Sequence, residues 1–144
     1  MAALPELDLH LMGLNVPTQS NETISLSGTE LKTCKLPEGT QFSMACTWDE
    51  VFSRIGSLER MFPEPDGSFM WVGFEGNREW QLNGMVYDRA GVVQWCEIKG
   101  KCPLSDWETL LTCFGWPQHS LIAQFPREQA FVQIEELKHL WQRS

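Results

Sequence analysis

The chain has 144 residues, of which 42% are hydrophobic and 21% are charged. This length and composition are typical of one globular domain over residues 1–144, with a core large enough to fold without disulfides or metal. Nineteen acidic and eleven basic residues give a formal charge of −8. Such a charge repels phosphate backbones, so we expect no nucleic acid partner.

The N-terminus and the cysteines both favour a cytoplasmic protein. No apolar run approaches the roughly 20 residues that a membrane span requires, so we expect no membrane association. The first residues include acids where a signal peptide begins with basic residues. Five cysteines, an odd number without a CxxC pair, indicate free thiols in a reducing compartment.

Residues 15–40 are the least regular part of the sequence. They are rich in Ser, Thr and Asn, and Pro17 and Pro37 interrupt any regular element. We therefore expect a loosely structured excursion here, with short strands near 23–26 and 31–36.

The pattern becomes clearer after this region. Residues 41–46 alternate weakly, which indicates a strand. Thr47 and Glu50 have the spacing of a capping box, which predicts the start of a helix. Apolar residues at helical spacing then continue through Met61.

A strand and a β-hairpin are predicted next. Residues 68–74 read as a strand, and a Gly-rich bend follows them. Alternating segments over 79–88 and 92–100 flank the sequence Asp-Arg-Ala-Gly at 88–91. This sequence is typical of a tight turn, since aspartate suits its first position and glycine accepts a positive φ.

The last third is predicted to begin with a helix. It follows Pro103 and has Ser105 as its cap. A strand over 120–125, a short return strand over 130–132 and a helix over 133–142 complete the chain. This order of elements predicts an α+β fold, a mainly antiparallel β-sheet with two to three amphipathic helices packed on one face.

Alternation divides the side chains of the hairpin between two faces. We expect the core-facing row to contain Trp80, Leu82, Val86, Cys96 and Ile98. We expect the outer row to contain Gln81, Asn83, Tyr87, Trp95, Glu97 and Lys99. A bulge at Gly91 would exchange the faces of the second strand, so that alternative stays open. Trp71 and Trp95 are the tryptophans that we expect outside the core.

The outer row is the candidate binding surface. Trp and Tyr offer a large contact area with few rotatable bonds, and the polar groups offer orientation. The same aromatic pairs also stabilise a sheet without any ligand. The sequence therefore leaves both readings open.

Catalytic and metal sites have weaker support. An enzyme would have its site at the edge of the sheet, using Glu75, Glu97, Cys102 or His119. Cys102 lies between Lys101 and Pro103, just before a helix start, where a cation and the helix dipole would lower its pKa. The spacing of Cys96, Cys102, Cys113 and His119 matches no zinc pattern, so we expect no metal and no cofactor.

These observations favour a non-catalytic binding module that uses the outer face of the hairpin over 79–100. Its partner would be another protein or a second copy of the chain, and any small-molecule ligand stays unknown. Two alternatives remain. One is the small enzyme described above, and the other is an acidic inhibitor or immunity-type protein that binds a basic partner.

Overall fold

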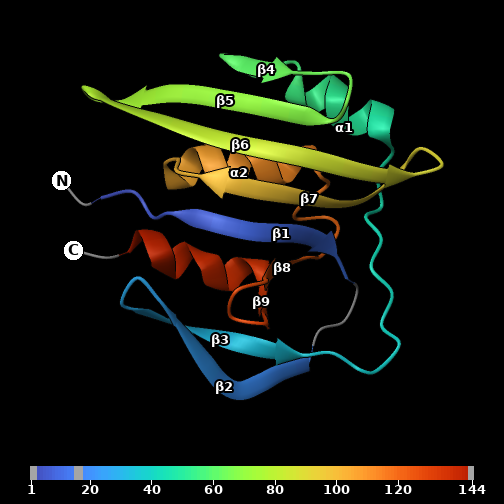
Figure 1. Ribbon diagram of the computed structural model, residues 1–144, viewed down its shortest axis with the longest axis vertical. Coiled ribbons are helices and arrows are strands. Elements are labelled where there is room, and N and C mark those ends of the chain that lie inside the picture. The colour runs from blue at the N-terminus through green and yellow to red at the C-terminus, as the bar shows by residue number, and fades with distance from the viewer. Residues whose placement is uncertain (1–2, 15–17, 143–144) are drawn as a thin grey trace.

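The computed structural model describes residues 3–14 and 18–142. The strands in these residues form one antiparallel sheet of nine strands, in the order β2-β3-β9-β8-β1-β7-β6-β5-β4 (Figure 1). The strands are β1 (Leu7–Gly13), β2 (Thr18–Leu26), β3 (Thr29–Lys35), β4 (Met61–Pro63), β5 (Ser68–Glu75), β6 (Arg78–Arg89), β7 (Val92–Gly100), β8 (Leu121–Phe125) and β9 (Ala130–Gln133).

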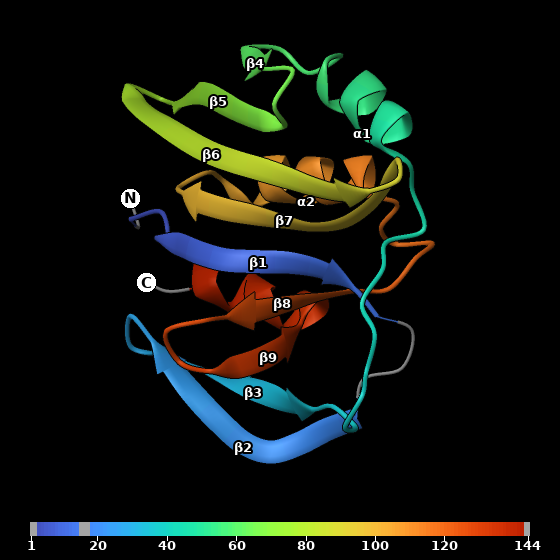
Figure 2. The ribbon, with the colours of Figure 1, turned by 45° about the vertical axis from the view of Figure 1, so that its right-hand side comes forward.

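The helices pack against one face of this sheet (Figure 2). They are α1 (Trp48–Ile55), α2 (Leu104–Cys113) and the 3-10 helix η1 (Ile134–Trp141). The predicted antiparallel sheet is thus confirmed, but strands make up 47% of the described residues and helices 19%, so the fold is predominantly β and α+β describes it only roughly. No described helix is long and apolar enough to cross a membrane.

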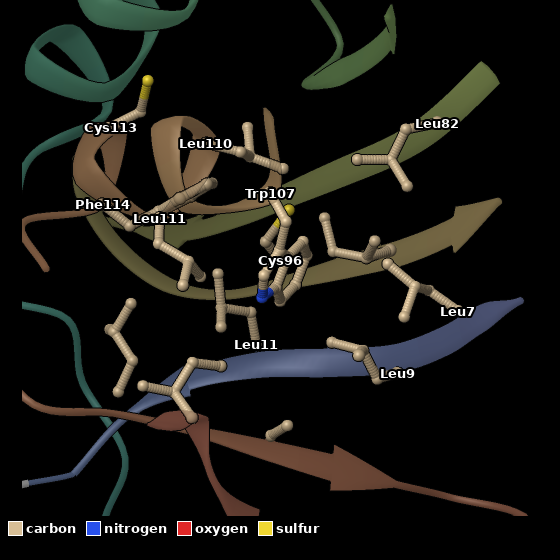
Figure 3. Close-up of a cluster of buried hydrophobic side chains, with 14 of the residues drawn as sticks. Leu7, Leu9, Leu11, Leu82, Cys96, Trp107, Leu110, Leu111, Cys113 and Phe114 are labelled. Carbon is tan, nitrogen blue, oxygen red and sulfur yellow. The ribbon is translucent and has the colours of Figure 1, made fainter. Parts of the chain in front are cut away.

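The core lies between the sheet and the helices, and β1 runs through its middle. This strand pairs with β7 on one side and β8 on the other. Its alternate side chains Leu7, Leu9 and Leu11 are almost fully buried. Figure 3 shows them directed toward Trp107 and Leu111 of α2, which are also buried.

The β6–β7 hairpin forms as predicted, with a two-residue turn. Ala90 and Gly91 have φ values of 52° and 84°, and the Asp88 carboxylate accepts a hydrogen bond from the Gly91 amide at 3.0 Å. The register then shifts, so that Asp88 pairs with Val93 while Tyr87 pairs with Trp95. Because of this bulge Val93 is buried, whereas Trp95 and the residues after it keep the face predicted for them.

The start of α1 also matches its prediction. The Thr47 hydroxyl accepts from the Glu50 amide at 3.2 Å, and the Glu50 carboxylate accepts from the Thr47 amide at 2.9 Å. The predicted extension through Met61 is wrong, because Gly56 caps the helix and Met61 belongs to β4.

The predicted cap of α2 is wrong as well. The helix begins two residues earlier, with Pro103 as its N-cap and Ser105 already inside the first turn. Pro103 has a φ of −65°, the value that the proline ring imposes and that suits the entry to a helix.

The two short strands expected near 23–26 and 31–36 are present, but they are longer, as β2 and β3, and they pair as a hairpin. Residues 18–35 are therefore not part of the loosely structured excursion that was expected over 15–40. Residues 15–17 lie outside the described residues. Ser27 and Gly28, with φ values of 52° and 83°, make the two-residue turn of the hairpin. The Ser- and Thr-rich composition hid the full length of these strands, because only Leu31 supplies a fully buried apolar side chain on β3.

The strand predicted over residues 41–46 is wrong. These residues run extended past the ends of β1 and β7, where the Ser43 amide donates to Gly13 at 3.3 Å and the Met44 amide donates to Val93 at 3.1 Å. The segment takes up the free edge of β7 where β1 ends.

Candidate functional site

The face of the sheet opposite the helices, which we name the outer face, has two unlike halves. Over β3, β9, β8 and β1 it carries a small buried cluster of Met12, Cys34 and Ile122. The partly buried Leu14, Leu36 and Phe42 pack onto this cluster, and Phe42 stacks on Phe131 with ring centroids 5.6 Å apart. The outer face of β4, β5, β6 and β7, which we name the open half, carries large exposed apolar side chains instead.

The register places all six predicted binding residues on the outer face. Tyr87 pairs with Trp95, and Asn83 pairs with Lys99. Glu97 lies between Trp95 and Lys99 on the same side of β7, and Gln81 lies two residues before Asn83 on β6. Gln81, Asn83, Tyr87 and Lys99 are exposed, whereas Trp95 and Glu97 are half-buried.

Trp95 is held between two aromatic neighbours rather than displayed to solvent. Its ring meets Tyr87 edge-on, with centroids 5.1 Å apart and planes at 82°, and lies 5.3 Å from the ring of His10. The indole nitrogen of Trp95 and Nδ1 of His10 are buried without a hydrogen-bond partner among the described residues. Trp95 thus packs against its neighbours in the sheet and is also part of the outer face.

The expectation that Trp71 lies outside the core is wrong. Its side chain is buried, its ring meets Trp80 edge-on at 5.3 Å, and its indole nitrogen donates to the Glu59 carbonyl at 3.0 Å. Trp71 faces the core because it pairs with Leu82, a core-facing residue of β6.

Three exposed apolar side chains on the open half were missed at the level of the sequence. Phe62 of β4 is 52% exposed, and Met70 and Phe74 of β5 are 38% and 63% exposed. Phe62 pairs with Met70, which pairs with Asn83, so they share the face of the predicted binding residues. The alternation of residues 68–74 contained this signal, since burial of Phe69 and Trp71 turns Met70 and Phe74 outward.

Tyr87 and Glu97 interact diagonally across the two hairpin strands. The Tyr87 hydroxyl donates to the Glu97 carboxylate, and this hydrogen bond, more than desolvation, raises the pKa of Tyr87. The acceptor favours the protonated phenol, which is the form that can donate. The pair therefore links β6 and β7 on the open half.

This interaction can be measured directly, because Tyr87 is the only tyrosine in the chain. We expect the tyrosinate absorbance of the folded protein to develop at a higher pH than that of the unfolded protein. Glu97→Gln should lower the pKa of Tyr87, because it removes the anionic acceptor. The control Glu79→Gln, on the same strand as Tyr87 but eight residues away, should leave this pKa unchanged. A folded-state titration that Glu97→Gln does not move would contradict the assignment.

The residues of the enzyme alternative do not come together. Glu75 pairs with Arg78 at the β5–β6 turn, and Glu97 lies opposite Met85, seven residues further along β6. His119 follows α2 and lines a separate polar hollow with Glu50 and Arg54. These positions share no single site.

The reactive setting predicted for Cys102 is wrong. Its side chain is fully buried, and burial raises its pKa instead of lowering it. Desolvation of the thiolate is the main cause, and the nearby Asp106 carboxylate raises the pKa further. The other four cysteines are also buried and their pKa values are raised, to about 11 for Cys46 and Cys113 and further for the fully buried Cys96.

We therefore expect all five thiols to resist modification in the native protein. A thiol reagent that reports free thiolate, used at mildly alkaline pH, should react only as fast as the protein opens. Addition of denaturant should release five equivalents at once. A single fast equivalent in the native protein would show that one thiol is accessible, and Cys102→Ser would test whether that thiol is Cys102.

Among the described residues, no three His, Cys, Asp or Glu side chains are placed to hold a metal ion. What the outer face offers is a surface of mixed aromatic, apolar and polar groups. No protein-family model, curated protein or solved structure matches the chain.

Proposed function

We propose that the chain is a non-catalytic binding module and that the open half is its contact surface for another protein. The observation that carries this proposal is the gathering of exposed apolar side chains there. Five large hydrophobic residues are exposed in the described chain, and four of them, Phe62, Met70, Phe74 and Tyr87, lie on the open half. Phe62 and Met70 are paired neighbours, whereas Phe74 and Tyr87 lie toward opposite ends of the same face. Exposed apolar side chains that are concentrated on one face are typical of contact sites, whereas ones scattered over the whole surface are ordinary.

Polar groups lie beside these apolar ones, as they do in protein interfaces. The Gln81 amide donates to Asn83 at 3.1 Å, which holds both side chains in place. Next to them is a shallow hollow of about 180 Å³ lined by Asn83, Gly84, Met85, Glu97 and Lys99. Its size suits one side chain of a partner rather than a separate ligand.

The face of the sheet is better suited to contact than its nearby edge. The edge strand β4 has three residues and ends at Pro63, which has no amide hydrogen to donate. Short edge strands with proline oppose pairing with another chain. A partner at this end of the sheet therefore packs onto side chains instead of adding a strand.

The double variant Phe62→Ser, Phe74→Ser tests the proposal. Both side chains are mostly exposed, so we expect the free energy of unfolding to change by less than about 1 kcal/mol. Affinity capture from the cells in which the protein occurs should lose the partner that the unchanged chain retains. Size-exclusion chromatography of the purified protein shows whether the partner is a second copy.

The matched control changes two exposed residues of the β2–β3 hairpin, Asn21→Ser and Glu30→Ser. This control should bind as the unchanged chain does. The proposal fails if the Phe62, Phe74 variant keeps its partner, or if the control loses it equally.

A further inference from the structure

The open half ends at an acidic pocket with aromatic walls. The pocket has a volume of about 520 Å³ and is formed by the start of α1, the β4–β5 turn and the end of the β6–β7 hairpin. Its lining residues are Trp48, Asp49, Pro65, Asp66, Met85, Val86, Tyr87, Asp88 and Gly91. Tyr87 belongs to both the pocket and the open half, so the two are continuous.

Three carboxylates line the pocket, and none forms an ion pair with a described residue. Asp66 accepts from the amide and hydroxyl of Ser68 at 2.9 and 2.7 Å, which lowers its pKa and keeps it ionised. Asp88 accepts from the Gly91 amide at 3.0 Å. The pocket therefore presents negative charge from side chains that are already held in position.

The aromatic walls are packed in place as well. Trp48 stacks on Phe52 with centroids 4.5 Å apart. A Cβ added to Gly67 would lie 2.8 Å from Cη2 of Trp48, so the ring rests directly on the backbone of the β4–β5 turn. Aromatic faces beside carboxylates suit a cationic side chain, and the planar guanidinium of arginine most of all.

The part of the chain that forms the pocket also has an excess of acidic residues. Residues 47–88 contain eight acidic and three basic residues. The three basic residues are arginines, and each pairs with a glutamate of the same segment, as Arg54 with Glu50, Arg60 with Glu59 and Arg78 with Glu75. The remaining acids are Glu64 and Glu79 together with the three aspartates of the pocket. They outnumber Arg89 and Lys99, the basic residues that follow on β6 and β7, so the surface around the open half keeps a net negative charge.

We propose that the partner of the open half is a basic protein, and that one of its arginine side chains enters the pocket between Trp48 and Tyr87. Its apolar residues then cover Phe62, Met70 and Phe74. This inference rests on the proposed function and adds the chemistry of the partner. Charge complementarity selects this occupant over a second copy, because two copies of an acidic rim repel each other.

A metal ion is a poorer occupant of the pocket. The aspartates come from three separate elements, and they are not among any group of side chains placed to hold a metal within the described residues. The volume of about 520 Å³ is also far larger than one ion fills.

The test uses a displayed library of random dodecapeptides, selected on the whole protein. We expect the selected peptides to be enriched in arginine together with aromatic or aliphatic residues. Binding of a selected peptide, measured by fluorescence anisotropy, should weaken at least tenfold when salt rises from low to several hundred millimolar, because ionic contacts are screened. Selection of peptides without basic residues, or of none, would overturn the inference.

Variants then separate the inference from the proposed function. A triple variant removes the negative charge of the pocket and keeps side chains that can make the same turns: Asp49→Asn, Asp66→Asn, Asp88→Asn. It should weaken binding of the peptide at least tenfold. The control Glu22→Gln, Glu30→Gln, Glu38→Gln removes equal charge far from the pocket and should weaken it less than twofold. If both triple variants bind equally, the inference fails. If Phe62→Ser, Phe74→Ser binds as the unchanged chain does, the proposed function fails instead.

Discussion

Trp107→Ala is expected to destabilise the fold by about 3–5 kcal/mol, the usual cost of deleting a large aromatic side chain from a core. Trp107 is 1% exposed and lies in the centre of the cluster between α2 and the sheet (Figure 3). Its ring stacks on Trp141 with centroids 6.1 Å apart. Removing it leaves a cavity that the surrounding leucines of two elements cannot fill. Denaturation by urea, followed by far-ultraviolet circular dichroism, measures the loss.

Phe74→Ala is the matched control for this prediction. The change again deletes an aromatic ring, but Phe74 is 63% exposed and loses few contacts. We expect its free energy of unfolding to stay within about 1 kcal/mol of the unchanged chain. Equal losses of stability from the two variants would contradict the placement of Trp107 in the core and of Phe74 on the exposed face.

Gly100→Ala is expected to cost about 3 kcal/mol or more, because backbone strain and a steric clash act together. Gly100 has a φ of 128°, which side chains rarely adopt. A Cβ there would lie 2.3 Å from the Gln81 carbonyl oxygen. That oxygen already accepts from the Lys101 amide at 2.8 Å, so neither strand can move away freely. The thermal midpoint of unfolding measures the effect.

Gly91→Ala isolates the strain from the clash. Gly91 also has a positive φ, of 84°, but nothing lies within 4 Å of the added Cβ. Its cost should be about 1 kcal/mol, from strain alone. If Gly100→Ala is no worse than Gly91→Ala, the close approach of β6 and β7 at Gly100 is wrong.

Local patterns in the sequence predicted the parts of the fold that depend on neighbours along the chain. The capping box of Thr47 and Glu50, and the alternation on both sides of the turn at Ala90 and Gly91, are interactions within a few residues. Such signals can be read from the sequence because the interacting residues are close together along the chain. The placement of the six candidate residues on the outer face followed from that alternation.

Non-local pairing could not be predicted in the same way. The central position of β1 depends on its pairing with β7 and β8, which are about 90 and 110 residues away along the chain. As a result His10 was not recognised as a neighbour of Trp95, although the alternation of leucines at 7, 9 and 11 places it on the opposite face. Burial of Cys102 has the same origin, because Trp141 from the end of the chain donates to its carbonyl at 2.8 Å.

The apolar part of the candidate surface was hidden for a different reason. Phe62 lies in a strand of three residues that ends at Pro63, which is too short to show alternation. Only its pairing with Met70 in the structure reveals which way it faces. The candidate site thus extends from the predicted hairpin to β4 and β5.

The arrangement has a simple physical basis. All three described helices bury their apolar sides against one face of the sheet, so that face supplies the stability. The outer face of β3, β9, β8 and β1 adds a smaller buried cluster. The open half contributes little to folding, which leaves its exposed side chains available for contact.

Site-specific photo-cross-linking tests this account most directly. A benzophenone side chain is placed at Phe74 on the open half or at Thr23, which is exposed on β2, and both proteins are irradiated in the cells in which the protein occurs. We predict a discrete protein adduct from position 74 and none from position 23. Equal adducts from the two positions, or an adduct from position 23 alone, would contradict the assignment of the open half as the contact surface.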